Sequence, residues 1–172
     1  KDTEILIPAR NIPLFLKELS LIRKGWFTKE GKPTPYMIKI LEKGKGDEEA
    51  AMNYWLENNG ELEGLKGPTP LQVAKDYEKG IGRLEKFARK HVGDRPYVTG
   101  LVGHSWEADT YLTYLAGGGK INSSIYKEIS SGKGIIKETE LASVKVNPKF
   151  TTISYRGKET KAKNLESLTG VL

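Results

Sequence analysis

Residues 97–117 read YVTGLVGHSWEADTYLTYLAG, a short apolar run followed by a turn and a helix-like segment. The run at 97–103, bounded by Pro96 and Gly103, predicts an inner strand of a parallel sheet covered on both faces. The helix is expected over 105–116, with Ser105 as its N-cap and the glycines at 117–119 ending it. This strand, turn and helix place a histidine, His104, at the turn.

The position of His104 points to ligand binding. Open α/β sheets bind ligands where strands end, and the unpaired N–H groups at a helix N-terminus attract anions. We therefore expect phosphate or a similar anion to bind beside His104 and Ser105. The alternative is a half-buried imidazole satisfied by a backbone carbonyl. His91, at the end of a predicted helix, is explained by a favourable cation near the last carbonyls.

Flanking segments alternate between helix and strand. A helix is predicted over 69–92, because Thr69, Pro70 and Gln72 match a capping box; another follows Asp47 over 48–56. Residues 4–7 suggest a short strand, 36–41 are too short to assign, and 121–129 form a strand or a helix. The alternating segments 135–146 and 150–155 predict an antiparallel edge hairpin, and the tail from Arg156 is expected to be polar surface.

These elements predict one α/β domain over 1–172. Its expected architecture is a three-layer α/β/α sandwich with a mostly parallel sheet and an antiparallel edge hairpin.

Composition narrows the function classes. The chain has 172 residues, a net charge of +6 and no cysteine, so disulfide frameworks and thiolate metal sites are excluded. No apolar run approaches the roughly 20 residues of a membrane span, which favours a soluble cytoplasmic protein with no membrane partner. Basic residues alternate with acidic ones, so nucleic acid is the least favoured partner and a phosphorylated small molecule fits the charge better.

Two hydrolytic mechanisms can be tested against the motifs. The segment Gly103-His104-Ser105-Trp106 begins like the G-x-S-x-G nucleophile elbow, but Glu107 replaces the final glycine and no histidine follows Ser105. A serine triad within this chain is therefore disfavoured. A lone strand-end histidine also lacks nearby metal ligands at any familiar spacing, so no metal and no cofactor are expected.

At residues 65–157 the sequence resembles the histidine phosphatase superfamily, the phosphoglycerate-mutase-like proteins. The resemblance is carried by TPLQVA at 69–74, VGHS at 102–105, LAG at 115–117, KETE at 137–140 and YRG at 155–157. It implies a phosphomonoesterase or mutase that works through a phosphohistidine intermediate, with His104 helping to bind the phosphoryl group. It also implies an acid in an L-x-E element, for which Glu18 is the nearest match.

The family's nucleophilic Arg-His-Gly motif is absent from this chain. The second family arginine has its nearest counterpart in Arg10. The candidate residues are thus His104 and Glu18 for catalysis, and His104, Ser105 and Arg10 for phosphate binding. Either the chain is the later part of a longer or split phosphatase, with the nucleophile on a missing segment or second chain, or it is a non-catalytic module that binds phospho-ligands.

Overall fold

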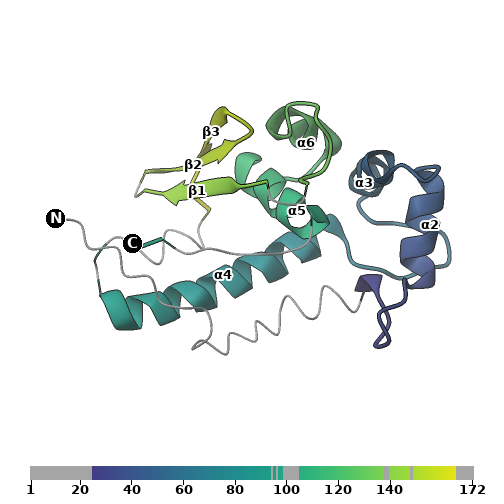
Figure 1. The fold of residues 1–172 in the computed structure, drawn as a ribbon, viewed down its shortest axis with the longest axis horizontal. Coiled ribbons are helices and arrows are strands. Elements are labelled where there is room, and N and C mark those ends of the chain that lie inside the picture. Colours follow the sequence, from purple (N-terminus) through teal and green to yellow (C-terminus); the bar gives the residue numbers. More distant parts are fainter. Residues whose placement is uncertain are drawn as a thin grey trace.

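The computed structural model describes residues 25–93, 95, 97–98, 105–137, 140–147 and 149–165. Helices and a small sheet follow one another along the chain (Figure 1). Their bounds are α2 Pro35–Lys43, α3 Glu48–Glu57, α4 Pro70–Val92, α5 Ser105–Ala116, α6 Ser123–Ile129, β1 Ala142–Val146, β2 Phe150–Tyr155 and β3 Lys158–Lys163.

Local capping signals fix where three helices begin. The Thr69 hydroxyl accepts a hydrogen bond from the Gln72 N–H at 3.2 Å, so the predicted start of α4 is confirmed. Asp47 caps α3 in the same way, accepting from the Ala50 N–H at 2.6 Å, again as predicted. The segment left unassigned at 36–41 belongs to α2, which Thr34 caps with Pro35 in the first turn.

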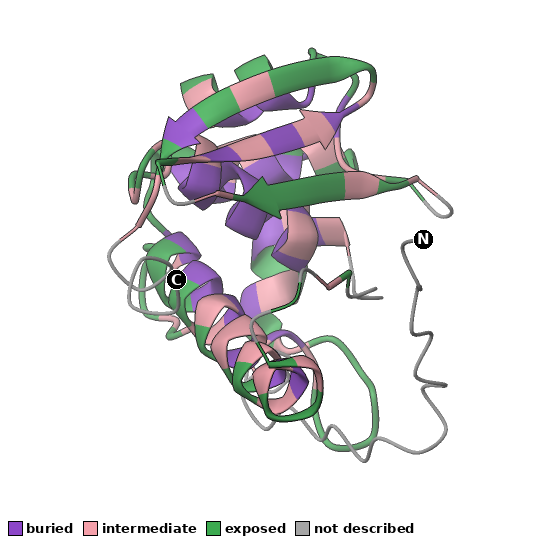
Figure 2. Cartoon of the chain, turned by 90° about the vertical axis from the view of Figure 1, so that its left-hand side faces the viewer, coloured by how far each residue is buried: buried purple, intermediate pink, exposed green. Residues whose placement is uncertain are grey.

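Helix α5 is the central element. Nine of its twelve residues are buried, which explains why its apolar side chains are not confined to one stripe. It contacts α4 along one side, α6 at another, and strands β2 and β3 above. In Figure 2 the buried residues gather accordingly between the sheet and the long helix α4.

The sheet is antiparallel throughout, with strand order β1-β2-β3. The predicted hairpin is present: Val144 of β1 pairs with Ile153 of β2, and residues 147–149 connect the strands. The tail lies at the surface as expected, but the strand in it was missed, because residues 158–163 form β3. The sequence KETKAK lacks apolar alternation since this edge strand buries only Ala162, and its pairing with β2 holds it in place.

The predicted sandwich is contradicted. The described residues contain five helices and a single three-stranded antiparallel sheet, instead of a mostly parallel sheet between helical layers. Tyr97 and Val98 belong to no strand and Val98 is 96% exposed, so the expected buried strand is wrong at its start; residues 99–103 lie outside the described residues. Parallel pairing needs a crossover of a dozen or more residues, whereas these strands are joined by tight turns.

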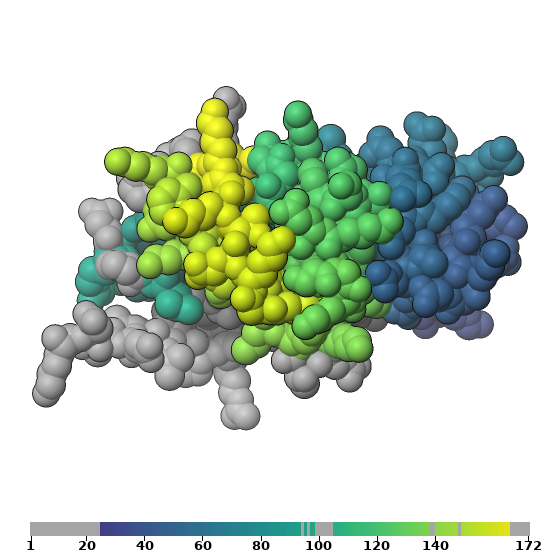
Figure 3. Space-filling model, turned by 90° about the horizontal axis from the view of Figure 1, so that it is seen from above, coloured from purple at the N-terminus to yellow at the C-terminus, as the bar shows by residue number. Residues whose placement is uncertain are grey.

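Two apolar clusters make up the interior. The first joins α2 and α3 to the starts of α4 and α5, and contains all three tryptophans, Trp26, Trp55 and Trp106, with ring centroids 5.2–5.8 Å apart. The second lies between α4, α5 and β2. Viewed from above, the sheet, α6 and the α2–α3 pair form a continuous row (Figure 3).

Candidate functional site

Of the four predicted site residues, the structure describes one. His104, Glu18 and Arg10 lie outside the described residues. Ser105 is half-buried and is the first residue of α5, so its expected role as N-cap was wrong by one position. The helix otherwise spans 105–116 as predicted. His91 lies in the last turn of α4, where its ring is 4.5 Å from that of Phe87, as expected for a structural histidine.

A hollow of about 170 Å³ opens at the start of α5, and we call it the α5 hollow. Three kinds of side chain line it: aromatic and apolar ones, a hydroxyl and two carboxyl groups. The lining residues are Trp26, Phe27, Met37, Glu48, Ser105, Trp106 and Glu107. They come from the segment before α2, from α2, from the first residue of α3 and from the first turn of α5.

The wall of the α5 hollow rests on a hydrogen-bonded aromatic cluster. Trp55 Nε1 donates to the Tyr36 hydroxyl at 3.1 Å and to the Pro68 carbonyl at 3.0 Å. The Tyr36 hydroxyl donates in turn to the Gly60 carbonyl at 2.6 Å, and burial raises the pKa of Tyr36 to about 12. These bonds anchor Trp55, and Trp26 and Trp106, which line the hollow, pack against it.

The polar lining combines opposite electrostatic influences. The first N–H groups of α5 have no partner within the helix, and the helix dipole adds about half a positive charge there. Glu48 is exposed at the rim and Glu107 is 7% exposed. An anion at Ser105 therefore meets N–H donors together with nearby carboxyl groups, which favours a singly charged anion over a doubly charged one.

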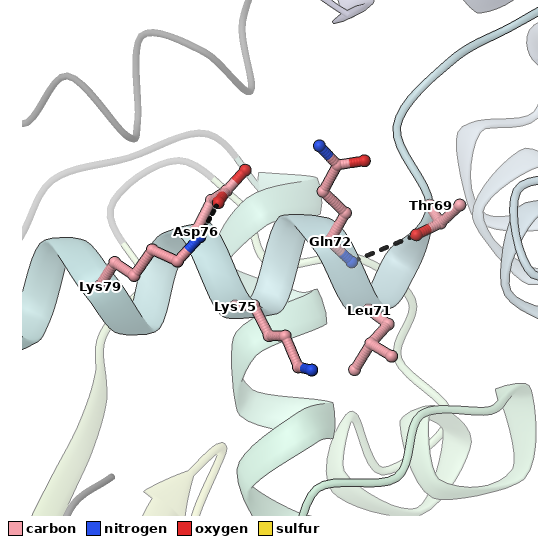
Figure 4. Close-up of a pocket in the computed structure, with 6 residues that line it drawn as sticks. All are labelled: Thr69, Leu71, Gln72, Lys75, Asp76 and Lys79. Carbon is pink, nitrogen blue, oxygen red and sulfur yellow. Dashed lines mark hydrogen bonds and ion pairs between the residues drawn. The ribbon is translucent and has the colours of Figure 1, made fainter.

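A second depression, of about 300 Å³, follows the first half of α4 (Figure 4). Leu71 and Lys75 point to one side of the helix, whereas Gln72 and Asp76 point away from them, and Lys79 is paired with Asp76 at 3.1 Å. Thr69 is already occupied as the helix cap. Since these residues all belong to one helix and its cap and do not converge, we take this surface as a solvated helix face.

The structure also brings together a buried polar cluster that the sequence analysis missed. Asp109 of α5 is fully buried, and its Oδ2 accepts from the Ile136 N–H at 2.8 Å. Burial raises the pKa of Asp109 to about 7, against the opposing effects of the Ile136 N–H and of Arg156. The sequence suggests no role for Asp109 beyond a favourable charge near the start of α5; its spacing of three from Trp106 and four from Thr113 was the available sign of burial.

The part of the chain that is described was searched for metal-binding groups and for membrane-spanning helices. None of its His, Asp and Glu residues gather into a group that could hold a metal ion. None of its helices combines the length and hydrophobicity required to cross a bilayer.

Comparison of the chain with protein-family models, with curated proteins and with solved structures gave no match.

Proposed function

We propose that this chain binds a small phosphomonoester in the α5 hollow and hydrolyses it slowly or not at all. The observation that carries the proposal is that the first turn of α5 opens into a hollow with aromatic walls. A helix N-terminus supplies donors for a phosphoryl oxygen, and aromatic walls supply contact area for an organic group.

The organic part of the ligand would lie against Trp26, Phe27 and Trp106. Each of these side chains offers a broad apolar face, and aromatic contacts prefer offset or edge-on geometries like those among the tryptophans themselves. A volume of about 170 Å³ suits one ring with a small headgroup.

The phosphoryl end would lie at Ser105. The resemblance to histidine phosphatases assigns phosphoryl contact to His104, the preceding residue in the sequence, which supports the same end of the hollow. Glu48 and Glu107 modify the expectation: they repel a dianion, so binding should strengthen as pH falls through the second phosphate pKa of about 6.

Catalysis is expected to be weak because a phosphohistidine mechanism needs a nucleophilic imidazole in line with the leaving oxygen. The chain has two histidines, and neither belongs to an Arg-His-Gly motif. An anion site can still position substrate and give a small electrostatic rate enhancement without a covalent pathway.

Calorimetric titration with phenyl phosphate at pH 5.5 and 7.5 tests the binding. Phenol and benzyltrimethylammonium are the matched ligands, sharing the ring but lacking the anion. We expect phenyl phosphate to bind more tightly than either, and about tenfold more tightly at the lower pH. Preferential binding of the ammonium compound would overturn the proposal and reassign the hollow to organic cations, which aromatic walls and carboxylates also suit.

Two substitutions at Ser105 separate the backbone donor from the side chain. Ser105→Pro removes the N–H at a helical position that tolerates proline, whereas Ser105→Ala keeps the N–H and removes only the hydroxyl. We expect the proline variant to lose at least tenfold in affinity for phenyl phosphate and the alanine variant to lose less. Equal affinities in all three proteins would place the phosphate elsewhere.

A further inference from the structure

All five guanidinium N–H groups of Arg156 bind other acceptors, so none is free to donate to Asp109. Its Nε and one Nη2 proton bind the two Glu140 carboxylate oxygens at 3.0 and 2.6 Å. The remaining guanidinium protons go to three backbone carbonyls, those of Ser130, Gly134 and Ile135, at 2.8–3.1 Å. Since a guanidinium carries five N–H groups, its capacity is filled.

Asp109 consequently lies in the interior with a single hydrogen bond, from the Ile136 N–H. Its Oδ1 is buried and has no partner among the described residues, and the same is true of the Tyr126 hydroxyl of α6. A neutral carboxyl group tolerates such surroundings much better than a carboxylate, because ionisation in a low-dielectric interior is costly without a direct partner.

The groups that act on Asp109 electrostatically come from several elements. Arg156 favours its ionised form and Glu140 opposes it. The phenols of Tyr126 and Tyr155 also interact with Asp109, and burial raises the pKa of both. On the α4 side, the acidic residues Glu78 and Glu85 act on Tyr111.

We propose that Asp109 is a pH-dependent latch that, when neutral, holds residues 134–137 against α5, and that its ionisation loosens this attachment. The backbone of this connector is attached at Ile136 to Asp109 and at Gly134 and Ile135 to Arg156. Loosening admits water to the carboxylate, which removes the cost of the buried charge. The connector joins α6 to the sheet, and its bonds to Arg156 and the bond of the Lys137 N–H to Glu140 persist, so the loosening is local to Ile136.

The direction of the pH effect follows from linkage. Asp109 has a pKa of about 7 in the folded protein, above its ordinary value of 3.8. The latch is therefore fully closed at acidic pH, and its stability declines as pH rises from about 4 to about 7. Above pH 7 the decline ends, because both the closed and the open forms are then ionised.

Hydrogen exchange of the Ile136 amide, corrected for its intrinsic pH dependence, measures the latch directly. We expect the protection factor in the wild-type chain to fall at least tenfold between pH 5 and pH 8. Asp109→Asn, which keeps the shape and the acceptor for the Ile136 N–H but cannot ionise, should show constant protection. The variant differs from the wild type at position 109 alone and retains both histidines.

The same fall in Asp109→Asn as in the wild type would overturn the proposal, as would constant protection in both. A carbon-13 NMR titration of the Asp109 carboxyl group in the wild-type chain does not depend on whether the variant folds. A midpoint near neutral pH supports the latch, and a midpoint near 4 overturns it.

Discussion

Arg156 grips Glu140 through two parallel hydrogen bonds, with Nη2 2.6 Å from Oε2 and Nε 3.0 Å from Oε1. The arginine side chain is 5% exposed and the glutamate 32%. Arg156 is also the first residue of the two-residue turn between β2 and β3, where its φ of 51° and the 78° of Gly157 fit a type I′ turn. The ion pair thus holds a non-glycine residue in a left-handed conformation.

Replacing Glu140 of the ion pair should make the free energy of unfolding depend less on pH in the acidic range. Hydrogen bonds from Arg156 hold the pKa of Glu140 near 2, below its ordinary value of 4.5. Its contribution to folding is therefore present above about pH 4.5 and is lost as pH falls towards 2. In Glu140→Gln, urea unfolding between pH 2 and 5 should show a flatter pH dependence; an unchanged slope would exclude the pair as the cause.

Arg156→Lys tests the geometry of the same pair. Lysine keeps the charge but cannot make two parallel bonds or serve three carbonyls. We expect a loss of about 2 to 3 kcal/mol in the free energy of unfolding at pH 7. Lys158→Arg, at an exposed position in the adjacent strand, is the control and should stay within about 0.5 kcal/mol of the wild type.

We expect alanine to change the stability of the protein in opposite directions at two glycine positions. A Cβ at Gly67 would overlap the ring of Tyr36, which is anchored by hydrogen bonds, so Gly67→Ala should destabilise strongly, by about 2 to 3 kcal/mol. A Cβ at Gly82, within α4, meets nothing within 4 Å. Gly82→Ala should stabilise by about 0.5 to 1 kcal/mol through helix propensity. Thermal unfolding of both variants measures the contrast.

Because Trp55 and Tyr36 share a hydrogen bond, we expect substitutions of the two residues to have coupled effects on stability. Trp55→Phe removes the indole N–H that serves both the Tyr36 hydroxyl and the Pro68 carbonyl, and Tyr36→Phe removes the bond to Gly60. Each change should cost about 1 to 3 kcal/mol. Because the groups touch, a double-mutant cycle should give a coupling energy of at least about 0.5 kcal/mol. Simple additivity would mean that the network contributes no cooperativity.

This chain should turn over an aryl phosphate very slowly, because it contains no Arg-His-Gly motif to supply a nucleophilic histidine. Steady-state assays of carefully purified wild type and His104→Ala should give rates that differ little. Robust wild-type turnover that disappears in His104→Ala would contradict the prediction and point to an unrecognised nucleophile.

Local features of this protein were predictable where a short segment carries its own signal. Thr69 with Pro70 and Asp47 with Ala50 define helix starts within four residues, so α4 and α3 were predicted correctly. Thr34 and Pro35 carry the same signal, yet the apolar segment after them was too short for a periodic pattern, and α2 was missed.

Features that depend on distant partners were not predictable in this way. The run at 97–103 is apolar enough for a buried strand, but whether a parallel neighbour exists is decided elsewhere in the chain. Arg156 was counted as polar surface because its hydrogen-bond partners lie 16 to 26 residues away. In the α5 hollow, only Ser105 was predicted. The opposite wall is contributed by Trp26 and Phe27, which precede α2, and by Met37 of α2, and their meeting with α5 is a tertiary contact.

The grouping of all three tryptophans has a spectroscopic consequence. Indoles 5.2–5.8 Å apart share excitation, so the tryptophan emission of this chain reports on the aromatic cluster at the α2–α3 end. The sheet side contains no tryptophan, and its buried aromatic residues are tyrosines such as Tyr155. Tryptophan emission therefore monitors the aromatic cluster, whereas far-ultraviolet dichroism averages over all the helices and strands. Two midpoints instead of one during unfolding would mean that the aromatic cluster melts separately from the rest of the fold.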